Sequence, residues 1–344
     1  VKLGTISDDG VKLYFNGELK IDNWTDHAAL FDGFTTVLEE GKEYDIKIEF
    51  YENGGDAVLQ FGYESLEDTL LAEAVNTAKE SDIALLFLGN SEYLESEGFD
   101  RTSLELPENQ LALLNAVLSV NKNVIVVLNN GGQILMSEWI DKVQGLVEAW
   151  FPGQEGGNAV ADVLLGNVNP SGKLPHTIAK KLDDYSAYKY YPGSDGKISY
   201  ADGLFVGYRY FDNNKIEPQF HFGYGLTYTS FKIEDVKVAN DDSKIKVSLN
   251  ITNTGNLEGS EVIQVYVSDK TNKIIRPVKE LKKFLKVLVK PGETKNVNLD
   301  LSTNDLKYYC IEKSQWTFEP GEYEILVGNS SNEKDLIFSS ITVN

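Results

Sequence analysis

Residues 83–90 read Ile83-Ala84-Leu85-Leu86-Phe87-Leu88-Gly89-Asn90, a continuous apolar run that stops at a glycine and an asparagine. A second run of this kind covers residues 124–128 and stops at Asn129-Asn130. Strands that are apolar on both faces are typical of a parallel sheet covered by helices on each side. The two runs therefore predict neighbouring strands of a parallel α/β layer.

The segments around these runs complete the α/β pattern. Apolar residues at helical spacing predict helices over 69–80, 109–120, 137–143 and 156–165, and a third short strand is expected at 145–150. In such a layer ligands bind outside the carboxyl ends of the strands. We therefore expect the chemistry in the loops that follow Leu88, Leu128 and Trp150.

Two further regions have the alternation of half-buried strands. Val11, Leu13 and Phe15 alternate with polar residues before an Asn16-Gly17 turn signal, and the pattern returns after Phe231 over about 110 residues. The later region suggests an immunoglobulin-like or fibronectin-type sandwich. Residues 168–228, rich in Pro, Gly and Tyr, are interpreted as a long ordered connection. Arg209, between Tyr208 and Tyr210, is expected either to stack or form an ion pair, or simply to lie on a surface strand.

The composition narrows the function classes. The chain has 344 residues, enough for two or three domains, and 32 Lys+Arg against 53 Asp+Glu give a net charge of −21. An acidic chain repels a phosphate backbone, which argues against nucleic-acid binding. No apolar run of about 18 residues predicts a membrane span. The start at Val1 says little about localisation.

Cysteine and histidine are scarce. The single cysteine, Cys310, leaves no intrachain disulfide and slightly favours the cytoplasm over secretion. The three histidines, His27, His176 and His221, nearly exclude a three-histidine zinc site. Asp8-Asp9-Gly10 fits a metal site or a turn, of which the turn is the better interpretation.

The loop after Leu88 is densely charged with acidic side chains. It places Glu92, Glu95, Glu97 and Asp100 within nine residues, beside Arg101. Crowded carboxylates raise one another's pKa and a neighbouring cation lowers it, so one acid can stay protonated for general-acid work. An ordinary solvated acidic loop is the alternative.

Two other motifs are weaker. The glycine-rich turn at 151–158 lacks both nucleotide-binding spacings, so its glycines more simply allow close packing. The sequence has no Gly-x-Ser-x-Gly elbow for a serine triad.

From Glu97 onward the sequence resembles a known family. Glu97-Gly98-Phe99-Asp100-Arg101, followed by residues 104–110, resembles the acid/base segment of glycoside hydrolase family 3, which includes many β-glucosidases. Further segments resemble the same family in order, at 149–164, 169–175, 205–211, 222–231 and, for its fibronectin type III-like domain, 280–293. The opening, residues 7–17 and 21–24, resembles a protective-antigen-type β domain that some of these enzymes carry.

The resemblance implies a multi-domain α/β plus all-β chain. Its parts would be the later portion of a protective-antigen-type β domain (1–66), an α/β sandwich domain (67–228) and a fibronectin type III-like β-sandwich (229–344). The family's barrel domain, which carries the Asp nucleophile, is not among these 344 residues. It would come from another part of the polypeptide or from a companion chain.

The implied activity is retaining hydrolysis of terminal β-glucosyl residues. Glu97 matches the acid/base position, with Glu92 and Glu95 less favoured. No metal or organic cofactor is implied. Phe31 or Phe34 could stack a sugar in the leaving-group subsite, although a core or turn aromatic is at least as good an interpretation.

Three questions stay open at this point. A β-xylosidase or exo-glucanase of the same family is an alternative, because most of the first-sugar pocket would lie in the barrel. A non-catalytic, calcium-dependent sugar-binding or adhesion module, using Asp8-Asp9, is an alternative of another class. A homo-oligomer is also left open.

Overall fold

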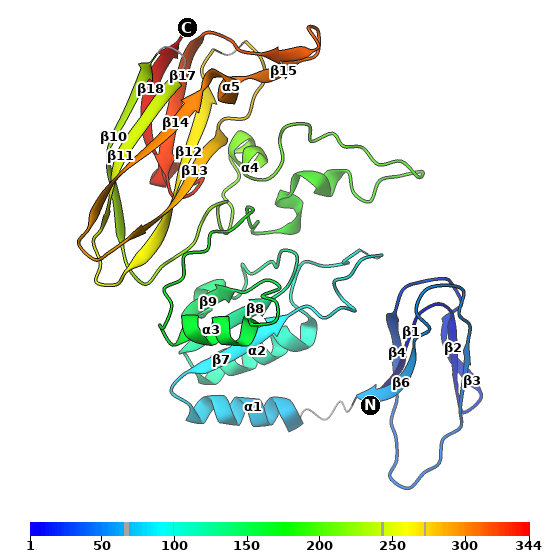
Figure 1. Cartoon of the computed structure of the whole chain (residues 1–344). Coiled ribbons are helices and arrows are strands. Elements are labelled where there is room, and N and C mark those ends of the chain that lie inside the picture. The colour runs from blue at the N-terminus through cyan, green and yellow to red at the C-terminus, as the bar shows by residue number, and fades with distance from the viewer. Residues whose placement is uncertain (65–68, 99, 242–243, 272) are drawn as a thin grey trace. The chain divides into compact units, whose positions relative to one another are not determined.

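The computed structural model describes residues 1–64, 69–98, 100–241, 244–271 and 273–344 (Figure 1). Two compact units emerge, one of residues 1–134 and 138–153, the other of residues 135–137 and 154–344. The predicted boundary between 66 and 67, and Phe99 of the acidic loop, lie outside the described residues.

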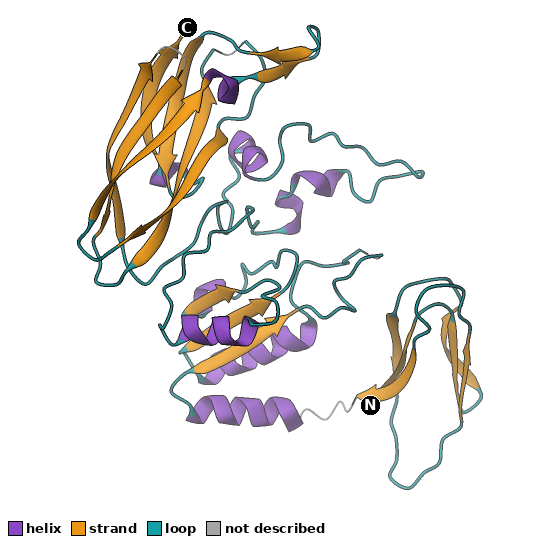
Figure 2. Ribbon diagram, in the orientation of Figure 1, coloured by secondary structure: helices purple, strands orange, loops and turns teal. Residues whose placement is uncertain are grey.

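The N-terminal strands form two three-stranded antiparallel sheets, ordered β4-β1-β6 and β3-β2-β5 (Figure 2). Their bounds are β1 Lys2–Ser7, β2 Val11–Phe15, β3 Glu18–Asn23, β4 Leu30–Thr35, β5 Ile46–Phe50 and β6 Leu59–Glu64. The predicted turn between β2 and β3 is confirmed, with Asn16 and Gly17 at φ 51° and 79°. The predicted inward residues Val11, Leu13 and Phe15 are buried.

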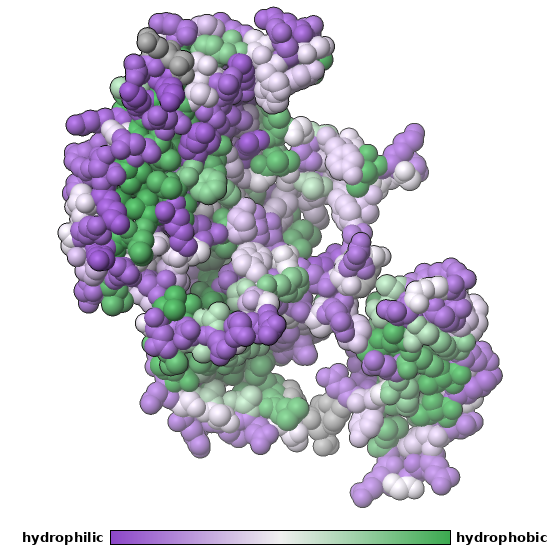
Figure 3. Space-filling view, in the orientation of Figure 1, coloured by the Kyte–Doolittle hydropathy of each residue, from purple (hydrophilic) through white to green (hydrophobic). Residues whose placement is uncertain are grey.

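The interior of this part is open along β6. Leu59, Phe61 and Tyr63 pair with Ser7, Thr5 and Leu3 of β1, whose side chains are buried, yet all three β6 residues are exposed. Figure 3 shows hydrophobic residues at the surface of this part. No described element covers β6 on this face.

The predicted parallel layer is confirmed. It consists of β7 Ala84–Gly89, β8 Val124–Asn129 and β9 Gly145–Glu148 in the order β7-β8-β9, with α1 Thr69–Glu80 packed against α2 Glu108–Val120. β8 is almost wholly buried, as its apolar run predicts. For β7 the predicted cover on both faces is wrong, because it is the edge strand and leaves Leu85 and Phe87 45% and 59% exposed.

The predicted helix at 137–143 is also wrong in extent. Only a 3₁₀ turn, η1 Ile140–Lys142, forms there. Trp139, in the middle of the predicted helix, has φ −133° and ψ −17°, which lies outside the helical region. The chain instead turns directly into β9.

The second unit begins with α3 Gly156–Leu164 and continues through irregular chain. That chain contains η2 Leu182–Asp184, η3 Ser186–Lys189 and α4 Tyr208–Asn214. The surface strand considered for Arg209 is wrong, because this residue lies on α4. The alternative is confirmed, since its guanidinium carbon lies 5.9 Å from the centroid of the Tyr208 ring and its Nη2 lies 3.9 Å from Glu280 Oε1. Tyr208 and Phe211, three residues apart, both pack inward, which is the helical rather than the strand period.

An antiparallel sandwich completes the second unit, as the alternating pattern predicts. Its sheets have the orders β10-β11-β14 and β13-β12-β17-β18, and a separate hairpin pairs β15 with β16. The bounds are β10 Phe231–Asp241, β11 Lys244–Asn253, β12 Gly259–Asp269, β13 Glu280–Val289, β14 Thr294–Ser302, α5 Thr303–Leu306, β15 Tyr308–Cys310, β16 Gln315–Thr317, β17 Gly321–Gly328, η4 Glu333–Asp335 and β18 Ile337–Val343. Among the helices described, none is long and apolar enough to cross a membrane.

Candidate active site

The acidic loop leaves the carboxyl end of β7 and returns at α2. Gln110 of α2 closes its base, since its side chain accepts from Gly89 N–H at 2.9 Å and donates to Gly89 O at 2.8 Å. The loop is therefore fixed at the edge of the sheet where parallel strands place their ligands.

Glu95 ties this loop to the next one. One oxygen of its carboxylate accepts hydrogen bonds from Asn90 Nδ2 at 2.9 Å and from Gly131 N–H, in the loop after β8, at 3.1 Å. The approach is close, because a Cβ on Gly132 would lie 2.8 Å from the other Glu95 oxygen and would displace this carboxylate. Glu95, one of the four carboxylates in the acidic loop, thus links the loop after β7 to the loop after β8.

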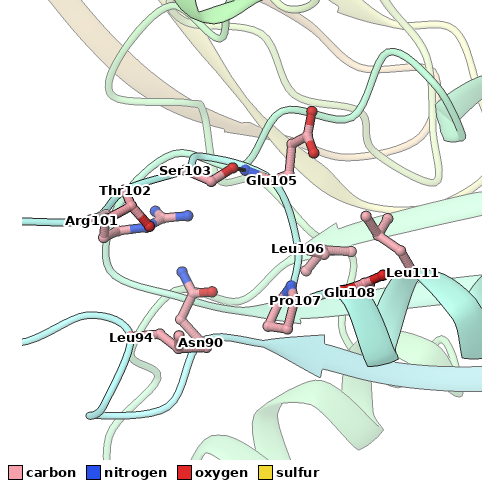
Figure 4. Close-up of a pocket in the computed structure, with 10 residues that line it drawn as sticks. All are labelled: Asn90, Leu94, Arg101, Thr102, Ser103, Glu105, Leu106, Pro107, Glu108 and Leu111. Carbon is pink, nitrogen blue, oxygen red and sulfur yellow. Dashed lines mark hydrogen bonds between the residues drawn. The ribbon is translucent and has the colours of Figure 1, made fainter. Parts of the chain in front are cut away.

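Arg101 makes a second attachment. Its Nη1 donates to the backbone oxygen of Gln133 at 2.9 Å. Burial lowers the pKa of Arg101, and the charge of Glu95 offsets part of that effect. Figure 4 shows the guanidinium directed into the space enclosed by the loop.

Glu97 lies between these two attachments. It is exposed, and within the described residues its carboxyl has no hydrogen bond or ion pair. The next residue, Gly98, has φ +97°, a conformation that side chains rarely adopt. The loop is held on both sides of Glu97 while the carboxyl itself faces solvent.

Glu148 ends the third strand and was missed by the sequence analysis. Its carboxyl accepts from Trp150 N–H at 3.3 Å and from the Asn130 side chain. Burial raises the pKa of Glu148 to about 7, and the charge of Glu95 adds to the shift. The signal that could have found it is the acidic residue at the carboxyl end of a parallel strand.

A cavity of about 400 Å³ lies between the acidic loop and the start of α2 (Figure 4). Its walls include Asn90, Leu94, Arg101, Glu105 and Leu111. Glu97 is not part of its lining. The Glu97 carboxyl therefore does not face this cavity.

The two aromatic candidates have different surroundings. Phe34 packs against the core and meets Phe15 edge to face at 5.6 Å. Phe31 is exposed, with Lys2 Nζ 4.9 Å from its ring centroid and the ring lying where a Cβ on Gly4 or Gly33 would clash. Phe31 is thus the more accessible of the two.

Asp9 occupies a turn between β1 and β2, at φ 64°. Its two carboxylate oxygens accept hydrogen bonds from the backbone N–H groups of His27, Asn53 and Gly54. The Asn53 bond is the main reason that the pKa of Asp9 lies below its usual value. A search of the described residues finds no group of three His, Cys, Asp or Glu side chains placed to hold a metal.

Comparison with known proteins now places the chain. The model of the glycosyl hydrolase family 3 C-terminal domain matches residues 9–228, which is 220 of 344 residues. The chain belongs to glycoside hydrolase family 3. Residues 261–331 also match a fibronectin type III-like domain. The predicted family and the fibronectin type III-like domain are confirmed, whereas the protective-antigen-type assignment of residues 1–66 stays a prediction.

The relatives of this family 3 chain are glycosidases. It is 44% identical over 312 residues to the thermostable beta-glucosidase B of Acetivibrio thermocellus, covering 87% of this chain and 41% of that protein. It is 40% identical to an exo-alpha-(1->6)-L-arabinopyranosidase of Bifidobacterium breve, covering 90% of this chain and 40% of that one. The chain thus spans about two fifths of the length of these relatives.

A solved structure gives the same result. The beta-glucosidase of Kluyveromyces marxianus, in complex with glucose, aligns with a TM-score of 0.83 at 34% identity. The alignment covers 100% of this chain and 43% of that one. The fold of the family 3 C-terminal region is therefore present here.

Proposed function

We propose that this chain supplies the general acid/base, Glu97, to a retaining β-glucosidase whose nucleophile comes from the remainder of the enzyme. The membership of the family and the beta-glucosidases among the relatives support the reaction class. The position of Glu97, exposed between two fixed points of the acidic loop, is the observation that carries the assignment.

The reaction would need one carboxyl group from each part of the enzyme. Retaining hydrolysis uses two carboxyl groups about 5–5.5 Å apart. The nucleophile attacks the anomeric carbon while protonated Glu97 gives its proton to the leaving oxygen. Glu97 then removes a proton from water, which attacks the glycosyl intermediate and releases the sugar.

The neighbouring carboxyl groups suit this role less well. Glu95 already accepts two N–H donors, so its carboxyl is held between the two loops and is less accessible to a substrate than that of Glu97. Glu148 is a protonatable acid, but it is partly buried at the end of β9 and bonded to Trp150 N–H. Glu95 holds the loop that presents Glu97, whereas Glu148 bonds to residues that follow β8 and β9.

The proposed substrate is a β-linked glucoside or oligosaccharide, with the exposed ring of Phe31 in the leaving-group subsite. A second candidate follows from the two Bifidobacterium relatives at 40% identity, which are exo-alpha-(1->6)-L-arabinopyranosidases. A β-xylosidase or exo-glucanase also stays an alternative. Measuring kcat/KM of the complete enzyme on an aryl β-glucoside, an aryl β-xyloside and an aryl α-arabinopyranoside decides among these activities.

The assignment of Glu97 is tested in the complete enzyme with two aryl glucosides. Glu97→Gln should lower kcat/KM by about 10²–10⁴-fold on a phenyl glucoside, which needs acid assistance. A glucoside with an activated leaving group should be affected far less. Glu92→Gln, an exposed carboxyl of the same loop, serves as the control. An equal loss on both substrates would argue against acid assistance by Glu97.

A further inference from the structure

Residues 186–206, called the tyrosine arm here, expose an unusual amount of apolar surface. Side chains that are 36–88% exposed follow one another along it: Tyr188, Tyr190, Tyr191, Ile198, Tyr200, Leu204 and Val206. Apart from η3, the arm has no helix or strand of its own (Figure 1, light green loop). Long loops without secondary structure and contiguous exposed apolar patches both usually mark functional surfaces.

The arm is anchored firmly at both ends. Before it, Tyr185 accepts a hydrogen bond from Ala179 N–H at 3.0 Å, and its ring meets Phe211 edge to face. After it, α4 is fixed to the sandwich, because Tyr208 accepts from Leu281 N–H at 2.8 Å and stacks on Phe222. A loop that is fixed at both ends loses less conformational entropy when a partner binds than a free segment does.

A cavity of about 180 Å³ lies at the base of the arm. Side chains of the arm and of α4 line it, among them Lys189, Tyr190, Asp202, Phe205, Tyr210 and Asn213. Oδ1 of Asp202 is buried and has no hydrogen-bond partner within the described part of the chain. A buried carboxylate oxygen without a donor is costly, so this site is complementary to an inserted N–H or O–H group.

The lengths of the relatives indicate what covers this surface. The match to the family model, residues 9–228, spans the arm. This chain covers only 40–43% of the length of the relatives named above, so more than half of each of them lies outside the matched region. No described segment of the chain covers the arm.

We propose that the tyrosine arm is the docking surface for the nucleophile-bearing part of the enzyme, which places a hydrogen-bond donor against Asp202. The inference rests on the proposed function, because that function requires a second part. It adds the surface by which the two parts join. The exposed aromatic side chains supply the apolar contact area, and the cavity at Asp202 supplies a polar anchor point.

Hydrogen exchange on this chain alone and on the complete enzyme tests the proposal. Peptides within 188–206 should exchange rapidly in the chain alone and at least about tenfold more slowly in the complete enzyme. Tyr200→Ser combined with Leu204→Ser should restore fast exchange there and shorten the thermal half-life of activity. Ile311→Ser, at a side chain 84% exposed against 88% for Tyr200, should change neither.

Three results would overturn the docking proposal. The first is an arm that exchanges equally fast in both proteins. The second is protection in this chain alone that grows with its concentration, which would make a second copy the occupant. The third is protection that appears only on adding cellobiose, which would make the arm a sugar site. A complete enzyme that protects the arm but hydrolyses no glycoside refutes the proposed function and leaves the docking intact.

Discussion

At the scale of single residues, Glu95 and Arg101 fix the acidic loop on either side of Glu97. Glu95 bonds to Asn90 and Gly131, and Arg101 bonds to Gln133, so the loops after two strands hold one segment in place. In the proposed mechanism Glu95 is a positioning residue, whose effect on the reaction would come through the placement of Glu97.

Glu95→Ala should lower kcat of the complete enzyme by about 10–100-fold with little change in KM, because displacing a catalytic group by about 1 Å costs as much. Glu95→Gln keeps an oxygen that accepts from Gly131 N–H and should retain most of the activity. Steady-state kinetics on an aryl glucoside measure both variants, with Glu92→Ala as control. Equal losses in the Ala and Gln variants would point to a role for the charge itself.

Glu148 gives the stability of the chain a pH dependence. Its pKa of about 7 in the folded state lies above the usual value of 4.5 for a glutamate, so the folded state holds the proton more tightly. The contribution of Glu148 to the free energy of unfolding is therefore greatest below about pH 4.5. It falls as the pH rises to about 7 and stays reduced above that value.

Glu148→Gln should remove this dependence. The variant is expected to be more stable than the parent by roughly 2 kcal/mol at about pH 8, allowing for the partly exposed site, and unchanged near pH 4. Urea unfolding at both pH values measures the difference. A stabilisation that is the same at both would mean that ionisation of Glu148 is not its cause.

At the scale of elements, the close approach of β7 and β8 depends on one glycine. Gly89 pairs with Asn129, and a Cβ on Gly89 would lie 1.9 Å from the Asn129 backbone oxygen. Gly89→Ala should therefore cost about 3 kcal/mol in the free energy of unfolding. Gly157→Ala on α3, where no atom lies within 4 Å of the added Cβ, should be neutral or slightly stabilising. Denaturant titration of both variants tests the comparison.

Periodicity predicted these elements where burial is one-sided or complete. The runs at 83–88 and 124–128 became β7 and β8, and Thr69–Glu80 became α1 with the predicted bounds. The prediction failed where neighbours decide the outcome. Leu85 and Phe87 look like core residues but lie on an edge strand, and Arg209 follows a Gly207 whose positive φ begins α4.

The candidate site was predictable where a local sequence pattern marks it, and not where contacts between distant residues form it. Ligands bind outside the carboxyl ends of parallel strands, and this rule pointed to the acidic loop, which is unusually rich in carboxylates. Glu148 is a single acid that ends an ordinary strand, and only its burial distinguishes it. The hydrogen bond between Glu95 and Gly131 joins residues 36 positions apart, a separation that no local sequence pattern reveals.

At the scale of the whole molecule, an ion pair with little exposure holds α4 to the sandwich of the second unit. Lys279 Nζ lies 2.5 Å from an Asp212 oxygen, and the two side chains are 5% and 17% exposed. Burial raises the pKa of Asp212, and the charge of Lys279 opposes that shift. The charge of Lys279 therefore favours the ionised form of Asp212, on the helix that follows the tyrosine arm.

Lys279→Met should destabilise the chain by about 3–5 kcal/mol, because it leaves the Asp212 carboxylate buried without a cation. Adding Asp212→Asn should recover most of the loss. Lys232→Met, which breaks the exposed Lys232–Glu234 pair, should cost less than about 1 kcal/mol. Unfolding of all three variants by urea provides the measurement, and a double variant no more stable than Lys279→Met would contradict this account.

The most direct test of the central claim is azide rescue of Glu97→Gln in the complete enzyme, with dinitrophenyl β-glucoside as substrate. Without Glu97 the activated substrate still forms the glycosyl intermediate, but water is no longer deprotonated, and azide needs no general base. We predict that azide restores turnover and that the product is a glucosyl azide of β configuration. Turnover of the variant close to that of the parent, or a loss that azide does not relieve, would contradict the assignment of Glu97 as the acid/base.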